Sequence, residues 1–480
     1  ALRQATTRFV RLPSGWARKP EETPDAIERA LADLGVEVGG GEQRLTLWQL
    51  AGAQASSLDA LATTGADDET LRAVRELRER VATFAGLPLV LPPRTLKARL
   101  RPYQRRGLDF LAFAGDLGGG AILADDMGLG KTVQTLAWIE HLRRRDPDDG
   151  PSLVVCPASV VHNWRREAER FLPSLRVLVL ERGSERHALR AEVARYDLVV
   201  TNYALLRRDA AEWRATKLRA VILDEAQNVK NPDAAVTHAA RGLHARYRLA
   251  LTGTPLENRP LDLFSIASVV CPGYLGTRAS FVAHFDHPEL PPARRVLLAA
   301  KLRPILLRRL KRDVAGDLPE RIEEQRDCEL SAGQRRLYLA ELAKSRDLVA
   351  RLEGEPDGLK KNRITILAAL TRLRQICCHP ALVGGRDELG AGKIEALFEL
   401  LEPLVAEGHK VLVFSQFVAM LRILERELAA RGLAHHVLTG ETVHRERVLQ
   451  RFANDPRPAV FLLSLKAGGT GLNLTAASYV

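Results

Sequence analysis

Residues 125 to 132 read Asp-Asp-Met-Gly-Leu-Gly-Lys-Thr, a glycine-rich turn that ends in a lysine and a threonine. The apolar run Ala121-Ile122-Leu123 precedes this turn, and a stretch with helical apolar spacing follows it. A strand, a glycine-rich turn and a helix in this order form the context of a phosphate-binding loop. Backbone N–H groups in such a turn and at the helix N-terminus favour anions. The stretch therefore predicts a triphosphate site.

Each position of this loop has an expected role. Lys131 should reach the β- and γ-phosphates, and the Thr132 hydroxyl should bind Mg²⁺. The strict pattern has glycine where this chain has Asp125, and the alternative interpretation is an ordinary surface turn. We assign the nucleotide-binding positions of the loop as Met127, Gly128, Leu129, Gly130, Lys131 and Thr132.

A second motif, Asp224-Glu225-Ala226-Gln227, follows about a hundred residues later. It comes directly after the apolar run Ala220 to Leu223, so Asp224 should lie at the sheet edge where ligands bind. We expect Asp224 to orient Mg²⁺ and Glu225 to polarise the attacking water. A solvated acidic turn is the weaker alternative, because two carboxylates directly follow a buried run. Together the two motifs make nucleoside-triphosphate hydrolysis the leading hypothesis.

The bulk composition limits the class of protein. The chain has 480 residues, enough for about three domains at roughly 150 residues each, and 46% are hydrophobic. A net charge of +12 favours a polyanionic partner, with nucleic acid first and an anionic membrane second. The alternative is solubility charge in an arginine-rich, alanine-rich composition of the kind a GC-rich bacterial genome encodes.

The cysteines and the hydropathy point to a reducing compartment. Five scattered cysteines do not suggest a disulfide framework. The pair Cys377-Cys378 before His379 lacks the two-residue gap of zinc knuckles, so we favour buried packing there. No run approaches the ~18 apolar residues of a membrane span, and Ala1 to Gln4 open no signal-peptide core. We therefore expect a soluble cytoplasmic protein.

The pattern along the chain divides it into four segments. Residues 1–97 form an accessory domain with helical spacing at Ala26 to Leu34 and Leu71 to Phe84. In residues 98–260, short apolar strands alternate with helices. Residues 261–390 are helical and arginine-rich, with long helices expected at Ala293 to Leu310 and Ser331 to Leu352. In residues 391–480, strands and helices alternate again. This predicts an α/β fold with two doubly wound, parallel-sheet lobes. The strand candidates are Ala121–Leu123, Leu153–Cys156, Val177–Leu180, Leu198–Thr201, Ala220–Leu223, Arg248–Thr252, Val411–Phe414, His436–Leu438 and Val460–Leu463.

Further motifs accompany these two in a fixed order along the chain. They are Arg101-Pro102-Tyr103-Gln104, Val155-Cys156-Pro157-Ala158-Ser159, Asn163-Trp164, Thr201-Asn202-Tyr203, Leu251-Thr252-Gly253-Thr254-Pro255, Leu306-Leu307-Arg308-Arg309-Leu310-Lys311, Cys377-Cys378-His379-Pro380, Val413-Phe414-Ser415-Gln416 and Ser464-Leu465-Lys466-Ala467-Gly468-Gly469-Thr470-Gly471. The series closely resembles the Swi/Snf family of ATP-dependent DNA translocases, within helicase superfamily two. The resemblance covers the chain from about residue 98 to its end.

The resemblance implies two RecA-like lobes that bind ATP and Mg²⁺ in the cleft between them. It assigns Gln104 to adenine recognition, although by itself this residue reads as an exposed helix position. It assigns Thr252 and Thr254 to coupling hydrolysis with lobe movement, where the bare sequence predicts only a turn after a strand. Gln227 stands where the Asp-Glu-Ala-His type of box has histidine, so this coupling is expected to be tuned differently.

The resemblance also implies a surface that contacts DNA. The motif positions expected to face DNA are Ser159, Asn163, Thr201 and Tyr203 in lobe one and Gln416, Lys466 and Thr470 in lobe two. Trp164 could stack on nucleic acid, but helix packing is the favoured interpretation. The glycines of 468–471 let backbone N–H groups approach a phosphate of DNA or of ATP, and we place Gly471 on the nucleotide side.

One family motif has no counterpart in the sequence. The arginines that contact the γ-phosphate from lobe two are expected after Asn473, and none follows. An arginine of this kind contributes about a thousandfold or more to turnover. Either the sequence is part of a longer protein or it is a poor ATPase. We expect the former, because the second lobe would otherwise lack a finished sheet.

The sequence thus predicts a DNA-dependent ATPase. We expect a monomer that moves along double-stranded DNA without separating its strands and remodels or displaces DNA-bound proteins, in association with a bacterial nucleoid. Two alternatives stay open: a strand-separating helicase, and an ATP-gated DNA-binding scaffold with little turnover.

Overall fold

The computed structural model describes residues 9–12, 15–18, 72, 75, 76, 79, 89–116, 120–181, 183, 186–253, 259–287, 289–314, 323–354, 357, 361–385, 390–468 and 474–480. The chain divides into two compact units, Ala1–Pro319 and Glu320–Val480. Within the first segment, β1 (Phe9–Leu12) and β2 (Gly15–Arg18) pair as an antiparallel hairpin. The helix expected at 26–34, most of the helix expected at 71–84, and the site residues Thr254, Thr470 and Gly471 lie outside the described residues.

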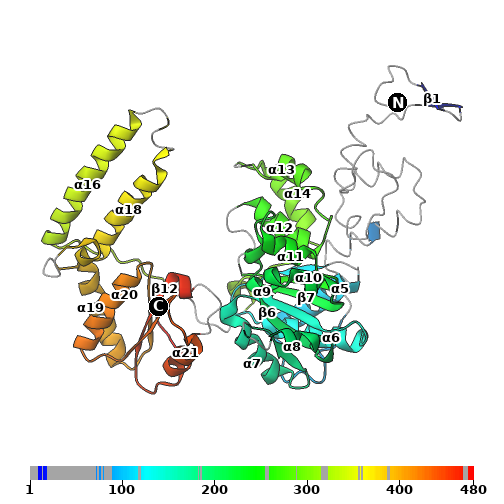
Figure 1. The fold of residues 1–480 in the computed structure, drawn as a ribbon, viewed down its shortest axis with the longest axis horizontal. Coiled ribbons are helices and arrows are strands. Elements are labelled where there is room, and N and C mark those ends of the chain that lie inside the picture. Colours follow the sequence, from blue (N-terminus) through cyan, green and yellow to red (C-terminus); the bar gives the residue numbers. More distant parts are fainter. Residues whose placement is uncertain are drawn as a thin grey trace. The chain divides into compact units, whose positions relative to one another are not determined.

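The first unit is built on a seven-stranded parallel sheet in the order β5-β6-β4-β7-β8-β3-β9 (Figure 1). Its central strands are almost fully buried: β3 and β4 at every residue, and β6 and β7 at every residue but the last, as expected for a parallel sheet that helices cover on both faces. The strands are β3 (Ala121–Leu123), β4 (Ser152–Cys156), β5 (Val177–Val179), β6 (Leu198–Asn202), β7 (Leu218–Asp224), β8 (Ala245–Leu251) and β9 (Leu306–Leu307).

Helices connect these strands and complete the core of the first unit. They are α5 (Pro102–Asp116), α6 (Lys131–Arg145), α7 (Val161–Phe171), α8 (Arg186–Ala191), α9 (Tyr203–Arg208), α10 (Ala210–Ala215), α11 (Ala235–Arg241), α12 (Pro260–Val270), α13 (Arg278–Phe285) and α14 (Pro292–Leu302), with short 3₁₀ turns at Ala158–Val160, Val193–Arg195 and Ala226–Val229. The strands predicted for this unit are confirmed to within one to three residues at their ends. The predicted α/β fold with a doubly wound parallel sheet is therefore confirmed.

The long helix predicted over Ala293–Leu310 is wrong beyond Leu302. Helix α14 ends at Leu302, two residues before Pro304, which has no N–H to continue the helical hydrogen bonds. It then forms the two-residue strand β9 and the short helix α15 (Lys311–Val314). Because β9 pairs with β3 at Ile122↔Leu306 and Leu123↔Leu307, this segment belongs to the sheet of the first unit.

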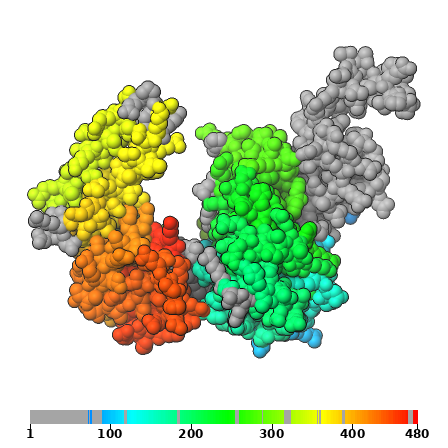
Figure 2. Space-filling view, in the orientation of Figure 1, coloured from blue at the N-terminus to red at the C-terminus, as the bar shows by residue number. Residues whose placement is uncertain are grey.

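The second unit has a three-stranded parallel sheet, in the order β10-β12-β11, and a two-helix hairpin. Its elements are α16 (Ala332–Glu353), α18 (Arg363–Cys378), α19 (Gly392–Ala406), β10 (Val411–Ser415), α20 (Val418–Ala430), β11 (His435–Leu438), α21 (Arg445–Asn454), β12 (Val460–Ser464) and α22 (Leu465–Gly468), with a 3₁₀ turn at Pro380–Val383. The hairpin of α16 and α18 projects from the body of this unit (Figures 1 and 2). The helical segment predicted for 261–390 is thus divided, with α12 to α14 in the first unit and the hairpin in the second.

One buried amide ties the hairpin to the rest of its unit. Gln334 forms a capping box with Ser331 at the start of α16, and its Nε2 donates to the carbonyl of Ile376 near the end of α18 at 2.7 Å. Its Oε1 also accepts from the N–H of Gly392, where α19 begins, at 3.4 Å. No helix in the part of the chain that the structure describes is long and apolar enough to cross a membrane.

Candidate nucleotide-binding site

The candidate site lies at the carboxyl ends of three neighbouring strands. Leu251 of β8 stands level with Leu123 of β3 on one side and with Asp224 of β7 on the other. The loops that follow these strands therefore start from one line across the sheet. Thr252 lies between the two motifs, and its N–H donates to the Leu123 carbonyl at 3.2 Å.

The phosphate loop between β3 and α6 requires glycine at two positions. Gly128 and Gly130 have φ values of 85° and 75°, in the left-handed region that favours glycine. A Cβ on Gly130 would also lie 2.5 Å from Nε2 of Gln104. Since α6 begins at Lys131, directly after this turn, the predicted succession of strand, turn and helix is confirmed.

Lys131 lies with both acidic residues of the second motif. Its Nζ donates to the carbonyl of Asp125 at 2.7 Å. Burial lowers the pKa of Lys131, while the nearby Glu225 and Asp224 carboxylates act in the opposite direction and favour its charged form. The fold thus brings one ammonium and two carboxylates together from positions about ninety residues apart in the sequence.

Asp125, the departure from the glycine pattern, is an anchor of the loop. Its side chain is fully buried, and its Oδ1 accepts from Nε of Arg309 at 2.8 Å. A second guanidinium nitrogen pairs with Oδ2, so the contact is bidentate. Arg309 also donates to Oε1 of Gln134 on α6 at 2.8 Å and to the carbonyl of Tyr103 on α5. Sequence reasoning did not single out Arg309, although it stands within the family-like stretch that begins at Leu306.

The segment around Arg309 is fastened to the loop by its backbone as well. The N–H of Asp126 donates to the Arg309 carbonyl, and Oδ2 of Asp126 accepts from the Lys311 N–H, both at 3.0 Å. Together with the pairing of β9 to β3, these bonds make residues 306–311 a strap across the start of the phosphate loop.

Gln104 lies against the phosphate loop. Its Nε2 donates to the Leu129 carbonyl at 3.2 Å, and its Oε1 accepts from the Arg101 N–H at 2.9 Å. The hydroxyl of Tyr103 donates to the same Leu129 carbonyl at 3.2 Å. Gln104 is buried, so the bare-sequence interpretation of an exposed helix position is wrong, and its contact with adenine stays a prediction.

Three donors hold Asp224 in place. Its Oδ2 accepts from Nε1 of Trp164 at 2.8 Å, its Oδ1 accepts from the N–H of Glu225 at 2.9 Å, and its carbonyl accepts from the Tyr203 hydroxyl at 2.7 Å. Trp164 is 1% exposed, which confirms packing rather than stacking on nucleic acid. Burial, together with the nearby charge of Glu225, raises the pKa of Asp224 to about 6, although the hydrogen bond from Trp164 acts in the opposite direction.

Two residues that were expected to face DNA lie inside the first unit. Tyr203 is buried and uses its hydroxyl to hold the end of β7. Thr201 is 1% exposed, and its hydroxyl donates to the Leu180 carbonyl at 3.1 Å. The expectation of DNA contact through these two side chains is therefore corrected, because neither side chain is available at the surface.

Glu225 has a constrained backbone and a defined orientation. Its φ of 50° and ψ of 58° place a non-glycine residue in the left-handed region, a conformation that costs about 1–3 kcal/mol and concentrates at functional sites. Its Oε2 accepts from Nε2 of Gln227 at 2.9 Å, and Oε1 of Gln227 accepts from the Thr252 hydroxyl at 3.3 Å. This chain of hydrogen bonds joins the second motif to the loop after β8.

The donor set fits ATP and Mg²⁺. Magnesium takes oxygen ligands and is commonly held by one or two protein groups together with substrate phosphates. The carboxylate of Asp224 and the hydroxyl of Thr132 are such groups, and a cation beside Asp224 would favour its charged form, which burial disfavours. The described residues contain no cluster of three or more histidine, cysteine or acidic side chains that would suit a metal held by protein alone.

Four other positions expected to contact DNA lie within the described residues, at least partly at the surface. Ser159 and Asn163 follow β4 and are half-buried, and Nδ2 of Asn163 donates to Oε1 of Glu167 at 3.4 Å. In the second unit Gln416 and Lys466 are exposed. Their contact with DNA stays a prediction.

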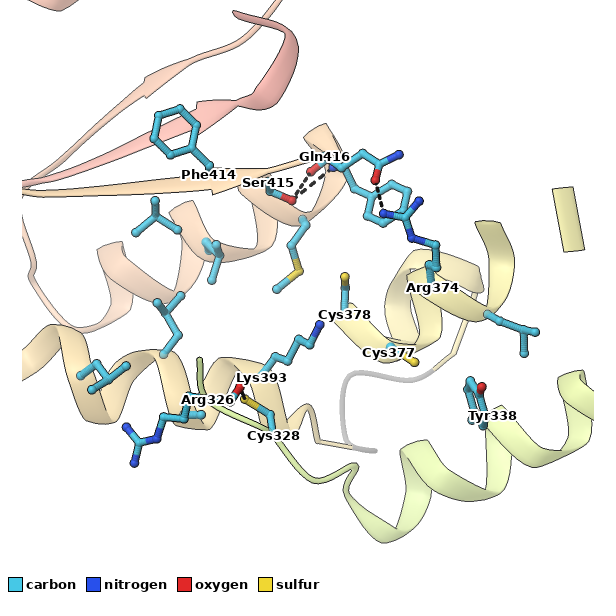
Figure 3. A pocket seen from close by; sticks show the side chains of 18 of the residues that line it. Arg326, Cys328, Tyr338, Arg374, Cys377, Cys378, Lys393, Phe414, Ser415 and Gln416 are labelled. Carbon is cyan, nitrogen blue, oxygen red and sulfur yellow. Dashed lines mark hydrogen bonds between the residues drawn. The ribbon is translucent and has the colours of Figure 1, made fainter. Parts of the chain in front are cut away.

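The second unit has a cavity of about 720 Å³ at the base of the hairpin (Figure 3). Apolar side chains of α18, α19, β10 and α20 form most of its wall, and Lys393 reaches into it beside Cys377 and Cys378. Both cysteines are partly buried, and burial raises the pKa of Cys377. Gln416 lines the rim and accepts a hydrogen bond from Arg374 at 2.5 Å.

The parallel sheet, the glycine loop and the adjacent acidic pair define an α/β protein of the phosphate-loop nucleotide-binding class. Comparison with protein families matches residues 103–382 to the SNF2-related domain and residues 392–480 to the helicase conserved C-terminal domain. The chain belongs to the SNF2 family of helicase superfamily two.

Two curated relatives illustrate the similarity. A Bacillus subtilis protein named "Putative ATP-dependent helicase/translocase YwqA" is 37% identical over 439 residues, which cover 88% of this chain and 47% of the relative. The human SWI/SNF-related matrix-associated actin-dependent regulator of chromatin subfamily A member 1 is 34% identical over 402 residues, covering 79% of this chain and 38% of the relative. The chain thus spans less than half the length of these two relatives.

One solved structure, a Sulfolobus solfataricus SWI2/SNF2 ATPase core in complex with dsDNA, is 36% identical. The similarity covers 81% of this chain and 82% of that one, with a TM-score of 0.47.

The first prediction concerns the Asp125–Arg309 pair. Among the described residues, Arg309→Met leaves the buried Asp125 carboxylate with Nε2 of Gln134, at 3.3 Å, as its one side-chain donor. The free energy of unfolding should therefore fall by about 3–5 kcal/mol. Chemical denaturation of the purified protein measures this change. Arg312→Met is the matched control, because Arg312 is 81% exposed and should change stability by about 0.5 kcal/mol or less. Adding Asp125→Asn to the Arg309 variant should recover part of the loss. If the Arg309 and Arg312 variants lower the free energy of unfolding equally, the Asp125–Arg309 pair does not anchor the loop.

The second prediction concerns the pH dependence of stability. Because the pKa of Asp224 rises from its ordinary value of 3.8 to about 6, the folded protein holds this proton more tightly than the unfolded chain. The stabilising contribution is therefore full below about pH 4 and is lost as the pH rises through about 6. Asp224→Asn should stabilise the nucleotide-free protein by about 2–3 kcal/mol at pH 8, and the gain should vanish near pH 4. Denaturation at both pH values checks this, and a gain independent of pH would contradict it.

Proposed function

We propose that this protein hydrolyses ATP with Mg²⁺ and uses the energy to move along double-stranded DNA, displacing or remodelling the proteins bound there. The observation that carries the proposal is the position of Lys131, between the glycine loop that follows β3 and the carboxylates that follow β7. One site therefore contains both the ammonium group that would bind the phosphates and the carboxylate that would orient the attacking water. Membership of the SNF2 family supports the same chemistry.

The side chains divide the reaction between them. The loop N–H groups and Lys131 hold the β- and γ-phosphates, and Asp224 and Thr132 are the protein ligands for Mg²⁺. Bound Mg²⁺ supplies positive charge to the phosphate oxygens as negative charge develops on them. Glu225 orients the attacking water and accepts its proton, while the hydrogen bond from Gln227 fixes the direction of the carboxylate.

The hydrogen-bond chain from Glu225 through Gln227 to Thr252 is the proposed coupling element. A change at the γ-phosphate that moves Glu225 must also change its bond to Gln227, and so reach the loop after β8. We propose that Thr254, two residues further along, continues this path. Glutamine suits this position because its amide donates to Glu225 and accepts from Thr252 at the same time.

Charge and exposure support DNA as the track. The net charge of +12 suits a polyanion, and contacts to the phosphate backbone hold DNA without selecting a sequence. The positions that we propose for these contacts are Ser159, Asn163, Gln416, Lys466 and Thr470, with Gly471 approaching the nucleotide. The names of the relatives include a translocase and a regulator of chromatin, which agrees with a motor that acts on DNA-bound proteins. We propose that it works as a monomer on the nucleoid of a bacterial cytoplasm.

A strand-displacement assay separates this proposal from its two alternatives. A translocase that keeps the duplex closed should displace a triplex-forming third strand or a bound protein while leaving a plain duplex paired. Efficient unwinding of the plain duplex would identify a helicase. ATP-dependent DNA binding with little phosphate release would identify a scaffold.

The third prediction separates binding from chemistry at Glu225. Glu225→Gln keeps the size of the side chain and removes its basicity, so ATP hydrolysis should fall by about 10²–10⁴-fold while ATP affinity stays within a few fold. Phosphate release and equilibrium binding of a fluorescent ATP analogue measure the two quantities. Glu169→Gln on the exposed face of α7 is the control and should leave both unchanged. Normal turnover of the Glu225 variant would exclude this residue as the base.

The fourth prediction concerns the phosphate contact of Lys466, which is exposed in α22. Lys466→Ala should weaken binding to a random-sequence duplex more at low salt than at high salt, and lower the slope of log affinity against log salt by about 1. Fluorescence anisotropy over a salt series measures this slope. Lys217→Ala is the control, because Lys217 is also exposed but pairs with Asp149 at 3.1 Å. A slope that matches the control would place Lys466 away from DNA.

A further inference from the structure

Helix α7 contacts both proposed magnesium ligands of the first unit. It follows β4, which pairs with β7 so that Val155 stands level with Leu223, the residue before Asp224. It also packs against α6, the helix that begins with Lys131 and Thr132. The helix therefore starts at the sheet edge where the site is built, beside the strand that ends in Asp224 and packed against the helix that carries Thr132.

Two side chains on one face of α7 contact these ligands. Trp164 and Glu167 are three residues apart, so they lie on the same side of the helix. The indole N–H of Trp164 donates to Oδ2 of Asp224 at 2.8 Å. The carboxylate of Glu167 accepts a hydrogen bond from Nδ2 of Asn163 at 3.4 Å. Burial raises the pKa of Glu167, while the Thr132 side chain lies near enough to favour the charged form of this carboxylate.

Each contact leaves its ligand in the state that a metal needs. A hydroxyl has one proton and two lone pairs, so a Thr132 hydroxyl that donates to Glu167 turns its lone pairs away from that carboxylate. The carboxylate of Asp224 accepts one N–H on each oxygen, from Trp164 and from the backbone of Glu225, and keeps further lone pairs free. Its plane is thereby fixed before any metal arrives.

We propose that α7 is the positioning element of the magnesium site, with Trp164 orienting Asp224 and Glu167 orienting Thr132. The proposal rests on the proposed function, since it takes Asp224 and Thr132 as the protein ligands. Outer-shell partners of this kind typically change metal affinity or activity about 10–100-fold when they are removed. Neither side chain contacts the phosphates in this account, so both should act on the metal rather than on the nucleotide.

The chain provides matched controls for both residues. Trp213 on α10 is as buried as Trp164, at 1% exposure, but its indole N–H has no hydrogen-bond partner among the described residues. Trp213→Phe therefore reports the cost of losing an indole from the core alone. Glu169 lies on the same helix as Glu167, is exposed, and pairs with Arg165 at 2.8 Å. Glu169→Ala reports the cost of removing a carboxylate from α7.

The test is calorimetric titration of a non-hydrolysable ATP analogue into each variant over a series of Mg²⁺ concentrations, and also in EDTA. Trp164→Phe should raise the half-saturating Mg²⁺ concentration at least tenfold, with the EDTA affinity unchanged within twofold. Glu167→Ala should do the same, so the proposal stays testable if one variant does not fold. Replacing Mg²⁺ with Mn²⁺ should restore binding to both variants. Trp213→Phe and Glu169→Ala should behave as wild type.

The outcomes that contradict the proposal are distinct from those that contradict the proposed function. If wild type binds the analogue equally well with and without Mg²⁺, the proposed magnesium site itself is wrong. If wild type depends on Mg²⁺ but the Trp164 and Glu167 variants match their controls, the positioning role of α7 is wrong. Equal losses of affinity in Mg²⁺ and in EDTA would also overturn it, because a general packing defect gives that result.

Discussion

The buried ion pair between Asp125 and Arg309 is the constraint on which the nucleotide site depends. An ionised carboxylate inside a protein is strongly unfavourable unless a partner compensates it, and here the partner comes from a residue 184 positions away. The phosphate loop can therefore adopt its observed course only when residues 306–311 lie across it. This explains why β9, although only two residues long, completes the sheet beside β3.

The pair also connects the site to the end of the first unit. The strap runs directly into α15 and towards Pro319, where the first compact unit ends. The carboxylate of Asp125 pairs with Arg309 of the strap at the start of the phosphate loop. The carboxylate of the next residue, Asp126, accepts from the backbone N–H of Lys311. Any movement of the phosphate loop is thus tied to the segment that leads out of the unit. A motor that converts nucleotide state into movement needs a connection of this type.

The other side of the site is organised around Asp224. Burial makes the charged form of Asp224 unfavourable. The indole N–H of Trp164, the backbone N–H of Glu225 and the ammonium of Lys131 act against that effect. Such a carboxylate lowers the stability of the nucleotide-free protein above about pH 6, and perturbed groups of this kind concentrate at functional sites. The left-handed backbone of Glu225 adds a second local cost at the same place.

Local pattern predicted the parts of this site that lie within one segment. The strand, glycine turn and helix around Lys131, and the acidic pair at the end of β7, are encoded by neighbouring residues and were placed correctly. The contacts between distant segments could not be read in the same way. Arg309 stood in a stretch predicted as helix, because a two-residue strand is too short to show its own periodicity.

Side-chain direction was the other limit. Tyr203 and Thr201 stand in motifs that suggested a DNA-facing surface, yet both side chains turn inward, one to the end of β7 and one to the Leu180 carbonyl. Trp164 was placed correctly in packing, but its hydrogen bond to Asp224 depends on how β4 and β7 lie side by side. The order of the strands in the sheet determines these contacts, and a single sequence does not reveal that order.

We propose that Lys131, Asp224 and Glu225 form one site that hydrolyses ATP on duplex DNA. The most direct measurement is the rate of phosphate release from ATP and Mg²⁺ by the wild-type protein, with and without duplex DNA, beside a Lys131→Ala variant. Release by the wild type should require Mg²⁺ and rise with duplex DNA, and the variant should show none. Release that is equal in the wild type and the variant would contradict it.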